Sequence, residues 1–391
     1  MKILLLGLMY SEWTRHFVED CLLKNGYEVW MIYRKDRQGA YKNYVKNYKE
    51  KGVHFIKLPK AVNNIPVKQE NFLKKLYLHF LLLNTVRKSG NYDLINLQYV
   101  GYINLIYAAI LKFLTRGKLV LSYWGSDLFR MEDKKLAFLG LFAKKADFVT
   151  FDSIDLEAKF RSQYKWASRV PAETVYFGLS ILDILKEKCE KSPLADVREK
   201  WGIPKDKTVV AVGYNGIPEQ QHLAVLKEIG KLNKKTKEKL FLILQMTYGD
   251  GGTKEYHEQV LAAACATGCE YSGIQNFLTD EQVAELRIIT DIFINAQTTD
   301  AFSGSVSENL FTGTVLMNAS WLRYQEFKDY AFKYLEFKSM SEIGTLIERV
   351  LASGFDVSGN KELVWQLRSW ENCALKWKKI YQGLTRKRTG K

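Results

Sequence analysis

Residues 291–318 read DIFINAQTTDAFSGSVSENLFTGTVLMN, and this stretch decides the fold class. An apolar run at 291–296 is followed by a segment rich in Gly and Ser, by a helical pattern with Leu310 and Phe311, and by a second apolar run at 314–318. Two buried strands joined through a helix are the unit of a parallel β-sheet. Because helices cover both faces of such a sheet, its strands read as continuous apolar runs, as these two do.

The same alternation runs along the whole chain and predicts an α/β protein. Helical patterns at 12–24, 102–115 and 134–145 separate several of the expected strands. Those strands are 2–7, 27–33, 53–58, 93–98, 118–124 and 147–151 in the first half, and 208–213, 239–246, 291–296 and 314–318 in the second.

The two series of strands predict two doubly wound, Rossmann-like domains. The apolar pattern loosens near 176–192, and the second series begins after the segment WGIPKDK. The Trp-rich end favours a helix that packs back across the domain junction, although its last residues, TRKRTGK, are also typical of a solvated tail. The expected organisation is an N-terminal domain at 1–178, a linker region at 179–205, a second domain at 206–361, and a C-terminal helix with a basic tail at 362–391.

The composition is that of a globular protein of more than one domain. The chain has 391 residues, of which 47% are hydrophobic, and only 6 are Pro. Its five Cys lack the spacing and the His partners of a zinc site, so we expect buried free thiols in a reducing compartment. The apolar start is too short for a secretion signal, and the run at 103–114 falls short of the roughly 20 residues that cross a bilayer. We therefore expect a cytoplasmic protein.

A net charge of +15 predicts an anionic partner: nucleic acid, phospholipid headgroups or a phosphorylated substrate. Nucleic acid is disfavoured because the basic residues are spread over every helix and form no recognised motif. Segment 68–90 places Phe72, Leu76, Phe80 and Leu83 on one helical stripe among Lys and Arg. This pattern fits a helix on an anionic membrane surface and equally a helix buried against the sheet with its basic side in solvent.

Loops at the carboxyl ends of the second-half strands are the expected binding site, since parallel sheets bind ligands there. Their glycines allow phosphate to approach the backbone, although Gly also ends strands for conformational reasons alone. At 303–307, Ser and Gly precede a helix whose first N–H groups can hold a diphosphate. Glu308 is placed to bind ribose hydroxyls, with Asp300 in the loop before it. An ordinary N-cap followed by a first-turn acid explains the same residues.

This arrangement resembles the C-terminal half of GT-B glycosyltransferases, especially the retaining, family 4-like class marked by an E-x7-E motif. Here the motif reads Asp300-x7-Glu308, followed by NLFTGTVLMN, and the segment YWGSDLFR at 123–130 is similar to a first-domain loop of that class. The resemblance implies a GT-B fold, with two Rossmann-like domains facing a central cleft. It also implies that Glu308 binds the nucleotide ribose, Asp300 the donor sugar, and the backbone at 304–307 the diphosphate.

The resemblance and the loop positions together give a set of candidate site residues. The class usually supplies an Arg and a Lys to the diphosphate; no Arg follows VVAVGYNG here, and His222 and Lys254 are the nearest replacements. Ordinary structural roles remain open: a turn for Asp127, a surface helix position for His16, a satisfied helix residue for His222 and a solvated Lys254. The candidates are, for catalysis, Asp127 and Asp300; for the donor, Gly213, Asn215, His222, Gly249, Lys254, Ser303, Gly304, Ser305, Val306, Ser307 and Glu308; and for the acceptor, Tyr10, His16 and Trp124.

The expected function is transfer of a sugar from a nucleotide-diphosphate donor to a glycan acceptor, lipid-linked, in bacterial surface polysaccharide or glycoconjugate synthesis. The nucleotide sugar is a substrate and we expect no cofactor; no metal is expected, because no Asp-x-Asp motif lies in a suitable loop. Retention at the anomeric carbon follows from the resemblance alone. The alternatives are a nucleotide-sugar epimerase or phosphorylase of the same fold, and a non-catalytic partner subunit. The cytoplasmic face of the membrane is a further candidate location.

Overall fold

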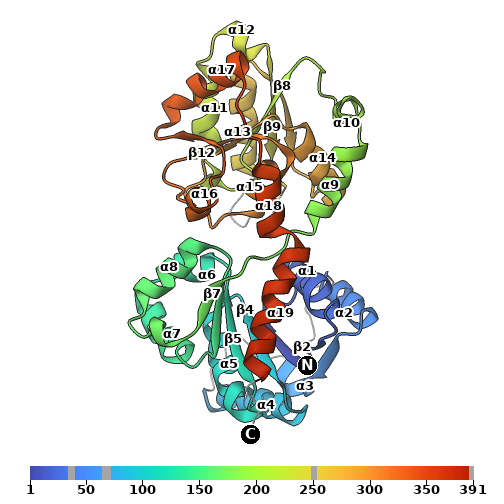
Figure 1. Ribbon diagram of the computed structural model, residues 1–391, viewed down its shortest axis with the longest axis vertical. Helices are drawn as coiled ribbons and strands as arrows, with labels where there is room; N and C mark the ends of the chain where they lie inside the picture. The colour runs from blue at the N-terminus through green and yellow to red at the C-terminus, as the bar shows by residue number, and fades with distance from the viewer. Residues whose placement is uncertain (34–39, 64–71, 248–252, 387–391) are drawn as a thin grey trace. The chain divides into compact units, whose positions relative to one another are not determined.

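The computed structural model describes residues 1–33, 40–63, 72–247 and 253–386 (Figure 1). The chain divides into two compact units. The first unit comprises residues 1–178 with the C-terminal segment from 370 onward, and the second comprises residues 179–369. Each unit is built on one parallel β-sheet covered by helices, so the predicted α/β class with two doubly wound sheets is confirmed.

The sheet of the first unit has seven described strands in the order β3-β2-β1-β4-β5-β6-β7, all parallel. Ile3, in an interior strand, pairs with Val29 on one side and Leu94 on the other, and all three side chains are fully buried. The chain reverses its direction of winding between β1 and β4. The strands are β1 (Lys2–Gly7), β2 (Glu28–Tyr33), β3 (His54–Lys57), β4 (Leu94–Gln98), β5 (Lys118–Tyr123), β6 (Phe148–Phe151) and β7 (Ala172–Thr174).

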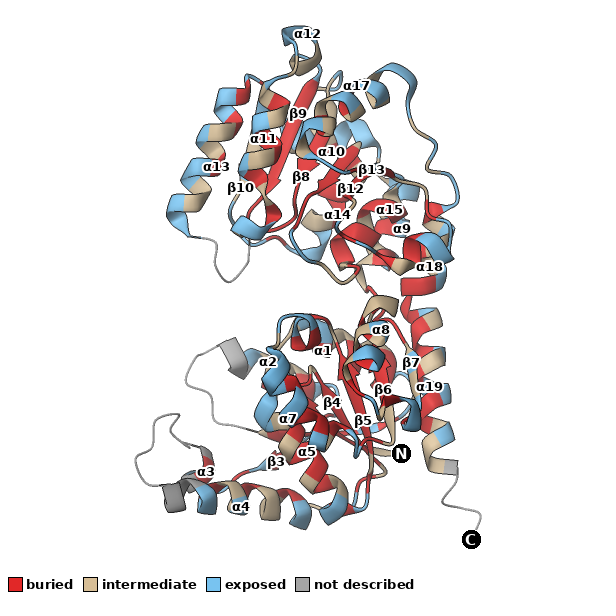
Figure 2. Cartoon of the chain, turned by 90° about the vertical axis from the view of Figure 1, so that its left-hand side faces the viewer, coloured by how far each residue is buried: buried red, intermediate tan, exposed pale blue. Residues whose placement is uncertain are grey.

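Helices surround this sheet on both faces (Figure 2). The helix predicted at 102–115 has those bounds, whereas the one predicted at 12–24 is a short α-helix that continues as a π-helix, η1. The described helices of the first unit are α1 (Glu12–His16), η1 (Phe17–Leu23), α2 (Ala40–Glu50), α3 (Lys60–Asn63), α4 (Phe72–Lys88), α5 (Tyr102–Thr115), α6 (Ser126–Phe129), α7 (Asp133–Ala143), α8 (Ile154–Gln163), η2 (Ala167–Arg169) and α19 (Trp370–Arg386).

The last helix, α19, completes the core of the first unit. Trp377 is fully buried, and its ring lies 4.8 Å from that of Phe17 and 6.1 Å from that of Phe177. The Tyr381 hydroxyl donates a hydrogen bond to Asn96 Oδ1 over 3.1 Å, within the sheet. Apolar and polar contacts therefore hold α19, the last described helix, against η1, β4 and the segment that contains Phe177.

The second unit has six described strands in the order β10-β9-β8-β11-β12-β13, again all parallel, and winds in opposite directions from β8 and β11. The strands are β8 (Thr208–Val212), β9 (Leu240–Gln245), β10 (Glu270–Ile274), β11 (Ile292–Asn295), β12 (Val315–Ala319) and β13 (Leu335–Phe337). The helices are α9 (Ile181–Lys191), α10 (Leu194–Lys200), η3 (Pro218–Gln220), α11 (His222–Gly230), α12 (Lys234–Lys237), α13 (Lys254–Thr267), α14 (Asp280–Ile289), α15 (Gly304–Thr312), α16 (Gln325–Asp329), η4 (Met340–Glu342), α17 (Ile343–Ser353) and α18 (Asn360–Arg368).

The segments expected as a linker and as the C-terminal helix have defined places in these units. Helices α9 and α10 occupy most of residues 179–205 and pack on α14 in the second unit. Residues 362–368 lie in α18 of the second unit, and a separate helix, α19, begins at Trp370 in the first. Cys189 and Cys265 are exposed, in contrast to the buried thiols that we expected. No described helix is long and apolar enough to span a membrane.

Candidate functional site

The point where the second sheet changes its winding direction lies between β8 and β11, and two loops meet there. Parallel sheets bind ligands in this position because the loops on either side diverge. Hydrogen bonds join the two loops: Thr298 N donates to Glu219 O over 2.9 Å, and Gln221 Nε2 donates to Ala296 O over 2.6 Å. The buried Gln220 also donates through Nε2 to Gln297 Oε1. The predicted donor loops are thus fixed to each other by side-chain amides.

Gly213 and His222 lie together in the first of these loops. Gly213 has a φ of +65°, and a Cβ at this position would lie 2.9 Å from His222 Nε2 and 2.8 Å from Gln220 Oε1. His222 begins α11 and is fully buried. Its Nδ1 lies 3.0 Å from the Tyr256 hydroxyl, while Nε2 has no hydrogen-bond partner among the described residues. Because buried polar atoms usually have a hydrogen-bond partner, His222 Nε2 is a group that a ligand beside Gly213 would satisfy.

The His222 ring is uncharged at neutral pH. Burial, reinforced by nearby His257, lowers the pKa of His222 to about 4. Burial also raises the pKa of Tyr256 to about 12, which keeps its hydroxyl protonated. If that hydroxyl donates to Nδ1, the proton of the neutral ring resides on Nε2, which then faces Gly213 as a donor. His222 therefore brings hydrogen-bonding capacity to this loop without the positive charge that the resemblance led us to expect.

The predicted diphosphate cradle is the start of α15. Ser303 is its N-cap residue, yet the Ser303 side chain makes no capping hydrogen bond, and its Oγ is buried without a partner among the described residues. Gly304 and Val306 follow within the first turn, and Ser307 donates through Oγ to Ser303 O over 3.4 Å. The first N–H groups of a helix have no intrahelical acceptor, so this turn offers donors to an anion.

Asp300 is held in place by the loop that contains it and by Tyr324. Its Oδ1 accepts from Ala301 N over 2.8 Å, and its Oδ2 accepts from Ser303 N over 3.3 Å and from the Tyr324 hydroxyl over 2.6 Å. Asn295 Nδ2 in turn donates to the Tyr324 oxygen over 3.1 Å. Burial, and then the Asp300 charge, raise the pKa of Tyr324 well above its usual range, so Tyr324 stays a donor. The carboxylate is therefore oriented before any ligand binds.

Glu308 is paired with Arg287, a residue that the sequence analysis did not single out. Arg287 Nε donates to Glu308 Oε2 over 2.9 Å, and the two side chains are 3% and 12% exposed. The same guanidinium donates to Gln245 Oε1 over 3.0 Å and to Ser305 Oγ over 3.2 Å. Arg287 thus joins the end of β9, α14 and the first turn of α15. It also holds one Glu308 oxygen and leaves Oε1 for another donor.

The remaining donor candidates are less engaged. Asn215 is 7% exposed, and its Oδ1 accepts from Ile217 N over 3.2 Å, which shapes the loop itself. Lys254 begins α13 with its side chain 84% exposed and its Nζ 3.7 Å from Glu258 Oε1. Gly249 lies outside the described residues. The structure therefore groups Gly213, His222 and the α15 residues around the change in winding, and leaves Lys254 on the surface of α13.

Asp127 in the first unit braces two loops. It is 2% exposed, and it accepts from Val100 N over 2.8 Å, Gly125 N over 2.8 Å and Trp124 N over 3.0 Å. Burial raises the pKa of Asp127 to about 6, against the opposing effect of these N–H donors. Both carboxylate oxygens are occupied by backbone. This geometry favours a positioning role, in which Asp127 fixes the loops after β4 and β5, over direct contact with a substrate.

The acceptor candidates lie at the carboxyl edge of the first sheet. Trp124 donates through Nε1 to Gln98 Oε1 over 2.9 Å, and its ring lies 5.2 Å from that of Phe177, which also contacts α1 through Trp13. Tyr10 precedes α1, and its ring lies 6.4 Å from that of Tyr44.

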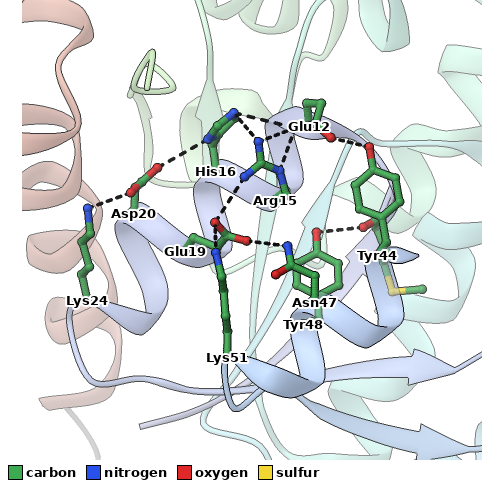
Figure 3. A network of polar contacts seen from close by, with 11 residues as sticks. Glu12, Arg15, His16, Glu19, Asp20, Lys24, Tyr44, Asn47, Tyr48 and Lys51 are labelled. Atoms are coloured by element: carbon green, nitrogen blue, oxygen red, sulfur yellow. Dashed lines mark hydrogen bonds and ion pairs between the residues drawn. The ribbon is translucent and has the colours of Figure 1, made fainter. Parts of the chain in front are cut away.

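His16 ends α1 within a network of charged side chains (Figure 3). Its Nδ1 lies 3.5 Å from Asp20 Oδ2, and its Nε2 lies 3.2 Å from Arg15 NH2 and 3.9 Å from Glu12 Oε2. Glu12 in turn accepts from the Tyr44 hydroxyl over 2.5 Å, which connects α1 to α2. The network already engages both ring nitrogens of His16. Its role in acceptor binding stays a prediction.

Comparison with known proteins bears on the fold and on the class of protein. Residues 2–153 match a family model described as Glycosyl transferase 4-like. Over 98% of its length, the chain superposes on a glycosyltransferase from Rickettsia africae ESF-5 (13% identity, 98% of that chain, TM-score 0.75) and on Anabaena HepE in complex with UDP (14%, 100%, 0.73). It also superposes, over 98% of its length, on a sucrose-phosphate synthase from Thermosynechococcus elongatus (15% identity, 99% of that chain, TM-score 0.70). The fold is GT-B.

The GT-B fold confirms the predicted architecture, and the family model together with these neighbours supports a transferase. A comparison with curated protein sequences gives no match. In the second unit of this GT-B chain, the Asp300-x7-Glu308 stretch lies at the change in winding direction of the sheet. Asp300 precedes the start of α15 and Glu308 follows it, and Ser303, the N-cap residue between them, makes no capping hydrogen bond through its side chain.

Proposed function

We propose that this protein transfers a sugar from a nucleoside diphosphate sugar to a glycan acceptor, with donor binding in the second unit. The observation that carries the proposal is the α15 start: Ser303 leaves the helix uncapped, Asp300 is oriented by Tyr324, and Glu308 is oriented by Arg287. Two oriented acids on either side of an open helix N-terminus match a diphosphate with a sugar on each side.

Each group then has a distinct role. Glu308 accepts hydrogen bonds from the ribose hydroxyls through Oε1, and Asp300 accepts from hydroxyls of the donor sugar. The N–H groups at 304–306 and the neutral His222 ring stabilise the charge that develops on the leaving diphosphate. Because these donors are fixed before binding, they lower the barrier without reorganisation during the reaction.

The finer features of the proposal follow from the resemblance to the retaining class. We propose retention at the anomeric carbon, no requirement for a metal ion, and an acceptor that is lipid-linked and belongs to bacterial surface glycan synthesis at the cytoplasmic face of the membrane. The first unit binds that acceptor beside Trp124, with Asp127 as a positioning residue. A uridine nucleotide is the first donor to test, because UDP and UDP-glucose are present in solved structures of Anabaena HepE.

A thermal-shift screen against UDP, GDP, TDP and CMP tests donor binding. A nucleotide at 100 times its dissociation constant stabilises a protein by about 2.7 kcal/mol, which is easily measured. Glu308→Ala should abolish the shift, whereas Glu258→Ala, on the exposed side of α13, should preserve it. A full shift in the Glu308 variant would contradict the ribose assignment.

A non-catalytic partner subunit is the second candidate, and one observation favours it. His222 lies in a donor loop, and burial lowers its pKa to about 4, so its ring brings no positive charge to a diphosphate at neutral pH. Hydrolysis of a panel of nucleotide sugars separates the two. Turnover of any donor supports the enzyme, and a nucleotide-induced thermal shift without turnover, with and without glycan acceptors, supports the subunit.

A further inference from the structure

Three neighbouring helices of the first unit expose large apolar side chains on one face. Helix α5 contacts α4 on one side and α7 on the other (Figure 2). Side chains of this size are usually covered in a soluble protein, and grouped exposure marks an interaction site. Between 41% and 66% of the surface of each is exposed for Tyr77 and Phe80 of α4, Tyr102 and Phe113 of α5, and Phe138 and Leu141 of α7.

Helix α4 is apolar on two faces, one buried and one exposed. The sequence fitted either a helix on a membrane surface or a helix buried against the sheet, and burial shows which residues face the sheet and which face away from it. Leu78, Leu82 and Val86 are turned into the core and are at most 5% exposed. Leu76 and Phe80, which belong to the stripe predicted at 68–90, are instead 56% and 63% exposed. These two residues of the stripe therefore face away from the sheet, and a second set of residues anchors the helix to it.

The exposed residues of α5 and α7 form a continuous surface. The rings of Tyr102 and Phe138 stack with centroids 5.4 Å apart and planes inclined by 14°, and Phe138 lies 5.5 Å from Phe142. At the other end of the two helices, Lys145 Nζ lies 6.0 Å from the centroid of Phe113. Aromatic rings next to ammonium groups are typical of surfaces that meet the headgroup region of a bilayer.

The charges on these three helices are mostly positive, although Lys112 pairs with Asp147 and Lys135 with Glu132. The sequences of α4 and α5 contain no Asp or Glu, and α7 contains one acid, Asp133. Basic residues at the ends of the helices are exposed, among them Arg87, Lys88, Lys134 and Lys144. A second copy of the chain would bring these like charges together, which disfavours self-association. An anionic surface with an apolar interior complements both the charge and the aromatic side chains.

We propose that α4, α5 and α7 form a docking surface for an anionic lipid bilayer. Aromatic side chains enter the headgroup region and the lysines contact lipid phosphates. Helix α5 begins beside Val100, at the loop that Asp127 braces, and its 14 residues extend about 21 Å toward the opposite edge of the sheet. The bilayer thus reaches the carboxyl edge of the sheet, where it would present a lipid-linked acceptor; this use of the surface rests on the proposed function.

Sedimentation with vesicles tests the surface. The full chain is mixed with vesicles of phosphatidylcholine alone or with phosphatidylglycerol, and the bound fraction is measured. The wild type should bind the anionic vesicles and bind neutral ones weakly. Phe113→Ser with Leu141→Ser should lower the partition coefficient at least about ten-fold through lost apolar contact. Lys144→Gln with Lys145→Gln should lower it about 30-fold, at about five-fold for each charge.

A matched control comes from the second unit. Phe277 is 76% exposed, and Lys234 and Lys235 are exposed, so Phe277→Ser with Lys234→Gln and Lys235→Gln removes the same chemistry elsewhere. This control should bind as the wild type does. Equal binding by control and docking-surface variants would overturn the proposal, as would a wild type that ignores anionic vesicles.

Two further measurements keep the outcomes separate. Analytical ultracentrifugation would overturn the proposal if it showed a dimer that Phe113→Ser with Leu141→Ser dissociates, because a second copy would then be the occupant. The UDP thermal shift of each variant reports on the second unit independently. Loss of vesicle binding with an intact shift supports the docking surface, and vesicle binding without any nucleotide shift supports the surface while contradicting the proposed function.

Discussion

Replacing Arg287 by Met should destabilise the second unit by about 3–5 kcal/mol at pH 7, the usual cost of removing one partner from a buried ion pair. Arg287 is 3% exposed, and its guanidinium contacts Glu308, Gln245 and Ser305. Without it, the Glu308 carboxyl group, at 12% exposure, loses the cation 2.9 Å away. An attraction at this distance is worth about 6 kcal/mol at an effective dielectric constant of 20, before the desolvation that offsets part of it.

The double variant Arg287→Met with Glu308→Gln should recover part of the loss, since it buries no unpaired charge. Each single change and the double change are compared by chemical unfolding of the full chain, followed by far-UV circular dichroism. The coupling between the two residues should be about 2–3 kcal/mol. The exposed pair of Arg161 and Glu157 supplies the control: Arg161→Met should cost less than about 1 kcal/mol.

Additive losses in this cycle, within about 0.5 kcal/mol, would refute the reasoning. They would mean that Glu308 is held by the α15 backbone and not by Arg287. The UDP thermal shift gives a second readout. A misoriented Glu308 should weaken UDP binding, so UDP should raise the melting temperature of the Arg287 variant less than that of the wild type.

Three other predictions follow from buried groups. Burial raises the folded-state pKa of Asp127 from 3.8 to about 6, so the folded protein binds the proton more tightly than the unfolded chain does. The free energy of unfolding of the wild type, relative to that of Asp127→Asn, should therefore fall by about 3 kcal/mol as the pH rises through this interval. Unfolding titrations in which this relative free energy rises with pH would contradict the prediction. Gly213→Ala should reduce stability by about 1–2 kcal/mol and should also reduce the UDP thermal shift. Gly268 has a φ of +77° and open space around it, so Gly268→Ala should reduce stability alone. Equal UDP thermal shifts in the two variants would exclude a role for the Gly213 position in nucleotide binding. Trp377→Ala should destabilise the first unit by about 3–5 kcal/mol in chemical unfolding, and a loss below about 1 kcal/mol would show that α19 is dispensable.

The interior strands could be predicted from the sequence because they are buried on both faces. All of the predicted strands were found, and the strands that were missed, β7, β10 and β13, lie at sheet edges. An edge strand has one neighbour and partial cover, so its residues need not be apolar: β10 reads EYSGI and has no fully buried residue. Such strands form because the sheet offers hydrogen bonds, which a local pattern does not record.

The site divides in the same way. Residues 300–308 could be located because the loop, the helix start and both acids are adjacent in sequence. Arg287 could not, because its contact with Glu308 depends on how α14 packs against α15. Its only local signal is a charged residue three positions after the buried Ala284, on the same side of the helix. The charge of His222 was also beyond the sequence, since its loss results from burial.

The return of α19 to the first unit affects how the protein is made. A ribosome releases residues 1–178 long before it completes 370–386, so the first unit emerges without the helix that carries Trp377 and Tyr381. Until then, Phe17 and Phe177 lack their contact with Trp377, and the apolar surface that α19 later covers is open to chaperones or to aggregation. A chain that ends before Trp370 should therefore contain all of the second unit and an incomplete first unit. A stop codon near the end of the gene should for this reason destabilise the N-terminal unit.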